Sequence, residues 1–150
     1  MPRWLFMWAI SAVIFFSFKW LAWHSLAQPA SSWPRIAAWW IVWPGMDAGR
    51  FLQLNPDPLV AAPSIGAWFK AIGITVADAA LFCVGEKLLA TEQKMAGCWC
   101  GMFGMLFMLH FGLFDLISCA YQAAGVDAPP IMNRPLAARS VGEFWGSRWN

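Results

Sequence analysis

Apolar residues occur in long stretches along this chain, and they determine the elements that the sequence predicts. Crossing the ~30 Å hydrocarbon core of a bilayer as an α-helix takes about 20 mostly apolar residues. The clearest stretch, Met95 to Phe114, has no charged residue in twenty positions. We predict three transmembrane helices, over residues 4–23, 65–85 and 95–119.

Polar positions interrupt two of these spans. Lys19 lies near the end of the first, and its long stem is expected to carry the ammonium out to the headgroups. Asp78 lies well inside the second, two turns from Lys70, which is too far for direct pairing. The sequence leaves two interpretations of Asp78 open: it meets a donor on another helix, or it faces a wet cavity.

A fourth apolar segment, residues 34–43, is too short to span a bilayer. Its most apolar part, Ile36 to Trp43, reaches only about 12 Å as a helix. Pro34 suits a helix start, and the Pro44–Gly45 pair predicts a stop. We expect a re-entrant or interfacial helix here.

The first apolar stretch also fits a cleavable signal peptide, with Ser25-Leu26-Ala27 as the cleavage site. That site lies nine residues beyond the apolar stretch ending at Phe18, after a lysine and two tryptophans. Further apolar segments follow it. An uncleaved first helix is therefore the preferred interpretation.

Composition supports a membrane protein. Sixty per cent of the residues are hydrophobic and 12% are charged, against roughly 25% charged in soluble domains. Twelve tryptophans suit the two membrane–water interfaces. High hydrophobicity excludes intrinsic disorder, and ten basic against eight acidic residues argue against a nucleic-acid partner. The expected fold class is all-α and polytopic, in the plasma or inner membrane of a bacterium or the endoplasmic reticulum of a eukaryote.

Small residues form a stripe on the third span. On an ideal α-helix Gly97, Gly101, Gly104 and Gly112 share one face, and Asp115 returns to the same azimuth. Such a stripe lets another helix approach closely. Packing within the chain is the preferred interpretation, and an oligomer through Gly97, Gly101 and Gly104 is the alternative.

The two histidines and four cysteines offer little chemistry. His110 lies about 140° around an ideal helix from Asp115, so neither side chain orients the other. We interpret His110 as a neutral histidine bonded to a neighbouring helix, and His24 as interfacial. The cysteines lack the paired C-x₂₋₄-C spacing of zinc sites, so no metal site is expected; they are Cys83, Cys98, Cys100 and Cys119.

The last residues predict a second kind of helix. Ser140, followed three residues later by Glu143, is a capping box, so a helix should begin there. With α-helical spacing, one face then carries Val141, Phe144, Trp145, Arg148 and Trp149. This pattern is typical of an interfacial amphipathic helix lying aromatic side down, with Arg148 reaching upward.

The same tail also matches a known motif. The matching residues are Arg134-Pro135, Ser140 and the run Glu143-Phe144-Trp145-Gly146-Ser147-Arg148-Trp149-Asn150. They resemble the R-P … S-[LV]-x-[DE]-F-W-G-x-R-W-N signature of wax synthase-like proteins, a branch of the membrane-bound O-acyltransferase superfamily. Two weaker matches are Trp43-Pro44-Gly45-Met46-Asp47 with Arg50-Phe51, and Leu109-His110-Phe111-Gly112-Leu113-Phe114.

This resemblance implies transfer of an acyl group from acyl-CoA, as co-substrate, to the hydroxyl of a long-chain alcohol in the membrane lipid. No other cofactor is implied. Asn150 matches the asparagine associated with the catalytic site, and Trp145, Arg148 and Trp149 match the motif around it and are the expected substrate-binding residues. From its charge and depth we expect Arg148 to meet CoA phosphates. The resemblance divides the chain into a transmembrane region, residues 1–128, and the start of an acyltransferase domain, residues 129–150.

The family's catalytic histidine lies downstream of the motif, whereas His24 and His110 precede it and do not match it. We therefore expect an N-terminal part of an acyltransferase, by natural truncation or an incomplete reading frame, that is inactive alone. Two alternatives stay open: an O-acyltransferase with a sterol, glycan or protein acceptor, and a small non-catalytic membrane scaffold or subunit.

Overall fold

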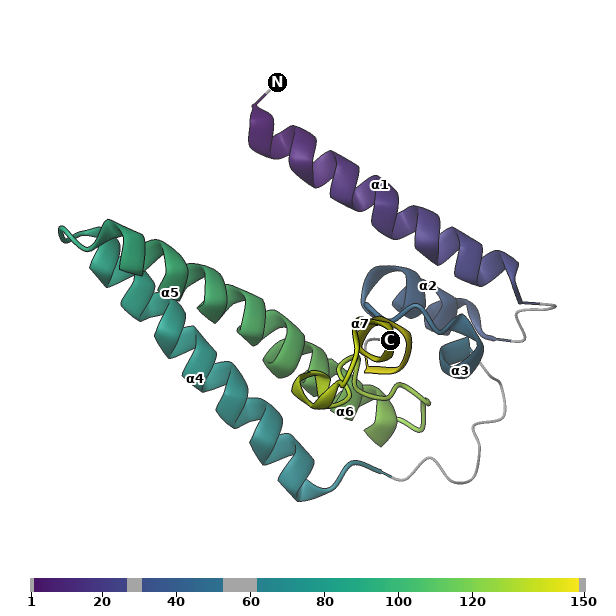
Figure 1. Cartoon of the computed structure of the whole chain (residues 1–150). Helices are drawn as coiled ribbons and strands as arrows, with labels where there is room; N and C mark the ends of the chain where they lie inside the picture. Colours follow the sequence, from purple (N-terminus) through teal and green to yellow (C-terminus); the bar gives the residue numbers. More distant parts are fainter. Residues whose placement is uncertain (1, 27–30, 53–61, 149–150) are drawn as a thin grey trace. The chain divides into compact units, whose positions relative to one another are not determined.

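The computed structural model describes residues 2–26, 31–52 and 62–148 (Figure 1). All regular elements in these ranges are helical. Three helices are long and apolar enough to cross a membrane: Leu5–His24, Ile65–Leu89 and Lys94–Ala123. The predicted all-α fold with three spans is therefore confirmed.

The chain divides into two compact units, which we call the N-terminal unit, Met1–Pro56, and the C-terminal unit, Asp57–Asn150. This division differs from the one drawn at residue 128 on the family resemblance, which stays a prediction. Each unit is described separately below.

The N-terminal unit contains helices α1, α2 and α3 (Figure 1), which cover Arg3–His24, Trp33–Ile41 and Ala48–Leu52. Pro34 lies in the first turn of α2, where its missing N–H costs nothing. With nine residues, α2 reaches only about 14 Å at 1.5 Å per residue. It is too short to span a bilayer, which agrees with the prediction for this segment.

Lys19 is fully buried in this unit, with 0% of its surface exposed. Its ammonium donates to three backbone carbonyls, those of Trp39 at 2.8 Å, Trp43 at 2.7 Å and Gly45 at 2.8 Å. The expectation that Lys19 reaches the headgroups is wrong, because the last turn of α2 and its following loop leave carbonyls without helical partners. The ammonium satisfies them and ties the loop to α1.

The loop after α2 depends on a glycine. A Cβ atom on Gly45 would lie 2.5 Å from Nε1 of Trp43, so a side chain there would displace the indole. Trp43 in turn stacks on Phe51, with ring centroids 5.5 Å apart. Asp47 Oδ1 accepts the backbone N–H three residues later at 3.0 Å and so caps α3. The loop is thus held at both ends.

The C-terminal unit is built on a helical hairpin. Helix α4, Ile65–Leu89, runs beside a second long helix that consists of α5, Lys94–Phe107, the π-helical turn η1, Met108–Leu113, and α6, Phe114–Ala123 (Figure 1). Ser64 begins α4 by accepting the N–H of Ala67.

Glycines allow the two long helices to approach backbone to backbone. A Cβ atom on Gly104 would lie 2.6 Å from the Phe82 nitrogen, and one on Gly97 would lie 2.8 Å from the Leu89 nitrogen. A Cβ atom on Gly101, by contrast, would meet nothing within 4 Å. The stripe therefore packs inside the chain, the preferred interpretation; the oligomer through Gly97, Gly101 and Gly104 stays a prediction.

The π-helical turn departs from the straight α-helix that the sequence predicts. It begins at Met108, and its hydrogen bonds join residues five apart instead of four. Gly112 within it lies against α4, where an added Cβ would be 2.5 Å from Thr75 Oγ1. Gly112 therefore lies against α4, as Gly97 and Gly104 do, which agrees with the predicted shared face. The place of Asp115 on that face stays a prediction.

The chain leaves α6 through a loop that folds back on the helix. Ser118 Oγ donates to the Ala128 carbonyl at 2.6 Å, and Gln122 Nε2 donates to the same oxygen at 3.0 Å. The loop turns at Gly125, whose φ of 75° is readily adopted by glycine. Three short elements follow, η2 at Pro135–Ala137, α7 at Val141–Glu143 and the π-helical turn η3 at Phe144–Arg148.

Candidate functional site

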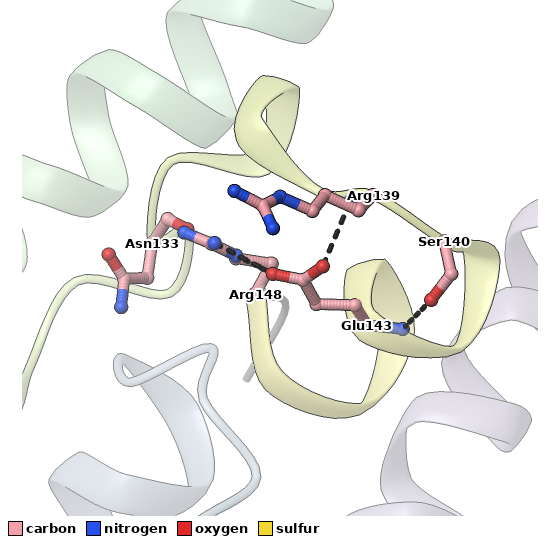
Figure 2. A network of polar contacts seen from close by, with 5 residues as sticks. All are labelled: Asn133, Arg139, Ser140, Glu143 and Arg148. Carbon is pink, nitrogen blue, oxygen red and sulfur yellow. Dashed lines mark hydrogen bonds and ion pairs between the residues drawn. The ribbon is translucent and has the colours of Figure 1, made fainter.

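The described motif residues lie in the tail, residues 133–148, which folds around the carboxylate of Glu143 (Figure 2). Ser140 ends the extended chain and caps α7, because its Oγ accepts the N–H of Glu143 at 3.0 Å. The predicted helix start at Ser140 is confirmed. The reciprocal bond is shifted by one residue, since Glu143 Oε2 accepts the N–H of Arg139 at 2.8 Å.

The other oxygen of Glu143 holds Arg148. Glu143 Oε1 accepts from Arg148 Nη2 at 2.7 Å and from Arg148 Nε at 3.0 Å. Charge-assisted bonds of this kind are about twice as strong as neutral ones. The two carboxylate oxygens of Glu143 thus tie the start of the tail helix to its last described residue (Figure 2).

Asn133 closes the tail into a ring. Its backbone N–H donates to the Arg148 carbonyl at 2.8 Å, and Arg148 Nη1 makes a longer contact of 3.4 Å with the Asn133 carbonyl. The next residue, Arg134, has a φ of 48°, which turns the chain into Pro135. The Arg134-Pro135 pair of the motif therefore lies where the chain turns, directly after the hydrogen bond between Asn133 and Arg148.

These contacts favour the charged form of Glu143. The backbone N–H of Arg139 and, next, the guanidinium of Arg148 hold the pKa of the Glu143 carboxyl below its usual value. The tail is therefore stabilised by a carboxylate at neutral pH.

The α-helical face predicted for the tail is wrong in detail. Helix α7 covers only Val141–Glu143, and the chain continues as the π-helical turn η3. In that turn Glu143 and Arg148, five residues apart, become neighbours. The Arg148 guanidinium binds this carboxylate instead of reaching upward, whereas Trp145 is 60% exposed.

Trp149 and Asn150, two of the residues that the resemblance assigns to the site, lie outside the described residues. Their roles stay predictions. Of the four assigned residues the structure therefore describes Trp145 and Arg148, both in η3. Trp145 also packs edge-on against Phe144, with ring centroids 5.0 Å apart.

The polar residues inside the spans lie apart from the tail motif in sequence. His110 is in the π-helical turn η1, where Nδ1 is 2.9 Å from the Leu106 carbonyl and its ring lies 5.4 Å from that of Phe114. Because a carbonyl only accepts, Nδ1 carries the proton. His110 is thus bonded through Nδ1 within its own helix. The predicted bond to a neighbouring helix stays a prediction.

Asp78 lies on α4 beside the glycine contact, since a Cβ on Gly104 would be 2.9 Å from the Asp78 carbonyl oxygen. Within the described ranges we find no hydrogen bond to its carboxylate. We also find there no group of three His, Cys, Asp or Glu side chains suited to a metal ion.

Two functional features were missed at the level of sequence. The Glu143–Arg148 pair was hidden because α-helical spacing separates residues five apart by more than a turn. The three backbone carbonyls that bind the Lys19 ammonium, which we call the carbonyl cage, were also missed. They lie 20, 24 and 26 residues from Lys19 in the chain, so no local pattern links them to it. The available signal was a lysine inside an apolar span followed by a Trp-Pro-Gly loop.

Comparison of the chain with protein-family models, curated proteins and solved structures finds no match.

Proposed function

We propose that this chain is the N-terminal part of a membrane O-acyltransferase, which moves an acyl group from acyl-CoA to the hydroxyl of a long-chain alcohol. The observation that carries the proposal is the tail motif. Its Ser140, Glu143 and Arg148 positions are joined by hydrogen bonds. Asn133, directly before the Arg-Pro pair, is hydrogen-bonded to Arg148. A motif built this way is expected to hold a surface in a fixed shape.

The reaction sets what the site must supply. The alcohol oxygen attacks the thioester carbonyl carbon, its proton passes to a general base, and the carbon–sulfur bond breaks to release CoA as the thiol. The base is a histidine in the family and is assigned to residues that follow the motif. Asn150 is proposed as the polar partner next to the developing oxyanion.

The contacts of Arg148 favour a role other than binding the phosphates of CoA. Two of its guanidinium nitrogens are already hydrogen-bonded to Glu143. We assign Arg148 to positioning the end of the motif, and the exposed residue Trp145 to contact with substrate. Trp149 is assigned to the same substrate surface by the resemblance.

An acyl-transfer assay tests the proposal. Membranes containing this chain, or the product of the reading frame extended past codon 150, are supplied with labelled palmitoyl-CoA and hexadecanol. We expect ester from the extended product and none from the 150-residue chain. Sterol, glycan and peptide acceptors in parallel reactions test the acceptor class.

The nucleotide sequence gives an independent check. The proposal expects further apolar spans with a histidine after codon 150. A stop codon there, with a stable partner protein in native gels, would instead support a non-catalytic subunit.

A further inference from the structure

Asp115 occupies an unusual place in the C-terminal unit. It lies in the first turn of α6, directly after the π-helical turn η1, within a thirty-residue apolar span. Its Oδ1 atom is buried, and within the described residues no hydrogen-bond donor reaches it. A carboxyl group without a partner is costly at this depth and marks a functional site by default.

Four polar side chains, one on α4 and three on the helix that carries Asp115, each donate a hydrogen bond to another group. Thr75 on α4 donates to the backbone carbonyl four residues earlier, at 2.8 Å. His110 donates through Nδ1 to the carbonyl four residues earlier, at 2.9 Å. Ser118 and Gln122 on α6 donate to the loop that follows that helix.

Lys70 on α4 is a basic residue to consider as a partner of Asp115. In the described part of the chain the two do not form an ion pair within 4 Å. The ammonium is on an exposed side chain, whereas the carboxyl group of Asp115 is half-buried. Lys70 therefore gives no hydrogen bond to the buried Oδ1 atom of Asp115 in the described part of the chain.

From this arrangement we infer that Asp115, beside the π-helical turn, binds the hydroxyl group of an aliphatic alcohol lying along the hairpin. A hydroxyl both donates and accepts, so it pairs with the ionised carboxylate and equally with the neutral acid. An ester or a hydrocarbon has no proton to donate. The surrounding span is apolar, which suits a long alkyl chain.

This inference rests on the proposed function, since it gives the acceptor alcohol a binding place in this chain. It assigns no proton transfer to Asp115. The rest of the acceptor's surface is expected to be alkyl chain against the exposed apolar side chains of the hairpin.

Photolabelling of the whole chain in nanodiscs tests it without acyl-CoA. The probe is a diazirine-bearing hexadecanol, compared with a diazirine-bearing hexadecane of the same length. We expect the alcohol probe to label peptides of η1 and α6 saturably, with competition by hexadecanol and not by hexadecane. Asp115→Leu should weaken saturable labelling about tenfold or more, and Asp115→Asn, which keeps hydrogen-bonding atoms, should weaken it less.

Asp78→Leu is the matched control, because it removes a carboxyl group from the other helix of the hairpin and should leave the labelling unchanged. Equal labelling by the two probes, or unchanged labelling of Asp115→Leu, would overturn the assignment. If Asp115→Leu does not fold, the two-probe comparison on the unaltered chain decides. Acyl-CoA binding at the tail is measured separately, so its loss does not affect this result.

Discussion

Glu143 Oε1 and Arg148 Nη2 lie 2.7 Å apart, and they join the start of the tail helix to its last described residue. Residues five apart meet in this way because η3 is a π-helical turn. With the Arg139 N–H on the other carboxylate oxygen, Glu143 is the centre of the tail.

Glu143→Gln should loosen the tail while leaving the hairpin intact. The amide keeps one acceptor but loses the charge that strengthens both contacts. We expect amide hydrogen exchange across residues 139–148 to be about two- to fivefold faster, the modest effect of an exposed ion pair. Glu86→Gln, at an exposed position on α4, is the control. Unchanged exchange in Glu143→Gln would refute the central role of this carboxylate.

Lowering the pH should also speed amide hydrogen exchange of the tail in the unaltered chain. The pKa of Glu143 is lowered in the folded tail by the Arg139 N–H and the Arg148 guanidinium, so the unfolded tail binds a proton more readily. The stabilisation is fully present above the ordinary glutamate pKa of about 4.3, which applies to the unfolded tail. It is lost as the pH falls from there through the lower pKa of the folded tail. Exchange of the tail, corrected for intrinsic rates, should therefore rise below about pH 4. The Glu143→Gln variant should lack this rise. The same rise in both proteins would show that a titratable group other than Glu143 causes it.

Lys19→Met should destabilise the N-terminal unit strongly. Methionine fills similar volume but donates nothing to the three carbonyls that the ammonium satisfies. Each buried carbonyl left unpaired costs roughly 1–3 kcal/mol, so we expect a loss of about 3 kcal/mol or more. Unfolding in mild detergent, followed by tryptophan fluorescence, measures it.

Lys70→Met is the control for that experiment, because the Lys70 side chain is exposed on α4. It should change the free energy of unfolding little. Equal effects of the two substitutions would argue against the carbonyl cage.

Gly104→Ala and Gly101→Ala form a matched pair on α5. A methyl group at Gly104 would lie 2.6 Å from the Phe82 nitrogen, and a helix backbone cannot easily move away. We expect Gly104→Ala to cost about 1–3 kcal/mol by forcing the helices apart. Gly101→Ala meets nothing within 4 Å and should be neutral or slightly stabilising. Thermal unfolding in detergent distinguishes them, and equal losses would contradict the register of the hairpin.

Much of this fold follows from local properties of the sequence. Span length and hydropathy are local, so the three long helices were predictable from apolar stretches alone. The cap at Ser140 was predictable because it involves residues three apart. The short α2 was predictable from the proline near its start and the Pro44–Gly45 pair after its end.

The parts that escaped prediction depend on distant groups. The π-helical turn η1 lies where Gly112 packs against Thr75, a residue on another helix. Lys19 is buried by carbonyls of a loop that no periodicity links to α1. In the tail, the motif resemblance predicts Arg148 as a site residue, but it does not predict that the Arg148 guanidinium binds Glu143.

Photolabelling of this chain by a diazirine-bearing palmitoyl-CoA tests the central proposal, an acyl-CoA site at the tail, most directly. We expect saturable labelling of residues 141–148, competed by palmitoyl-CoA and reduced about tenfold or more in Trp145→Ala, the loss expected when an aromatic contact is removed. Trp33→Ala, which removes an 83% exposed tryptophan of α2, should leave it unchanged. Labelling that palmitoyl-CoA does not compete, or that is equal in the two variants, would contradict an acyl-CoA site at the tail motif.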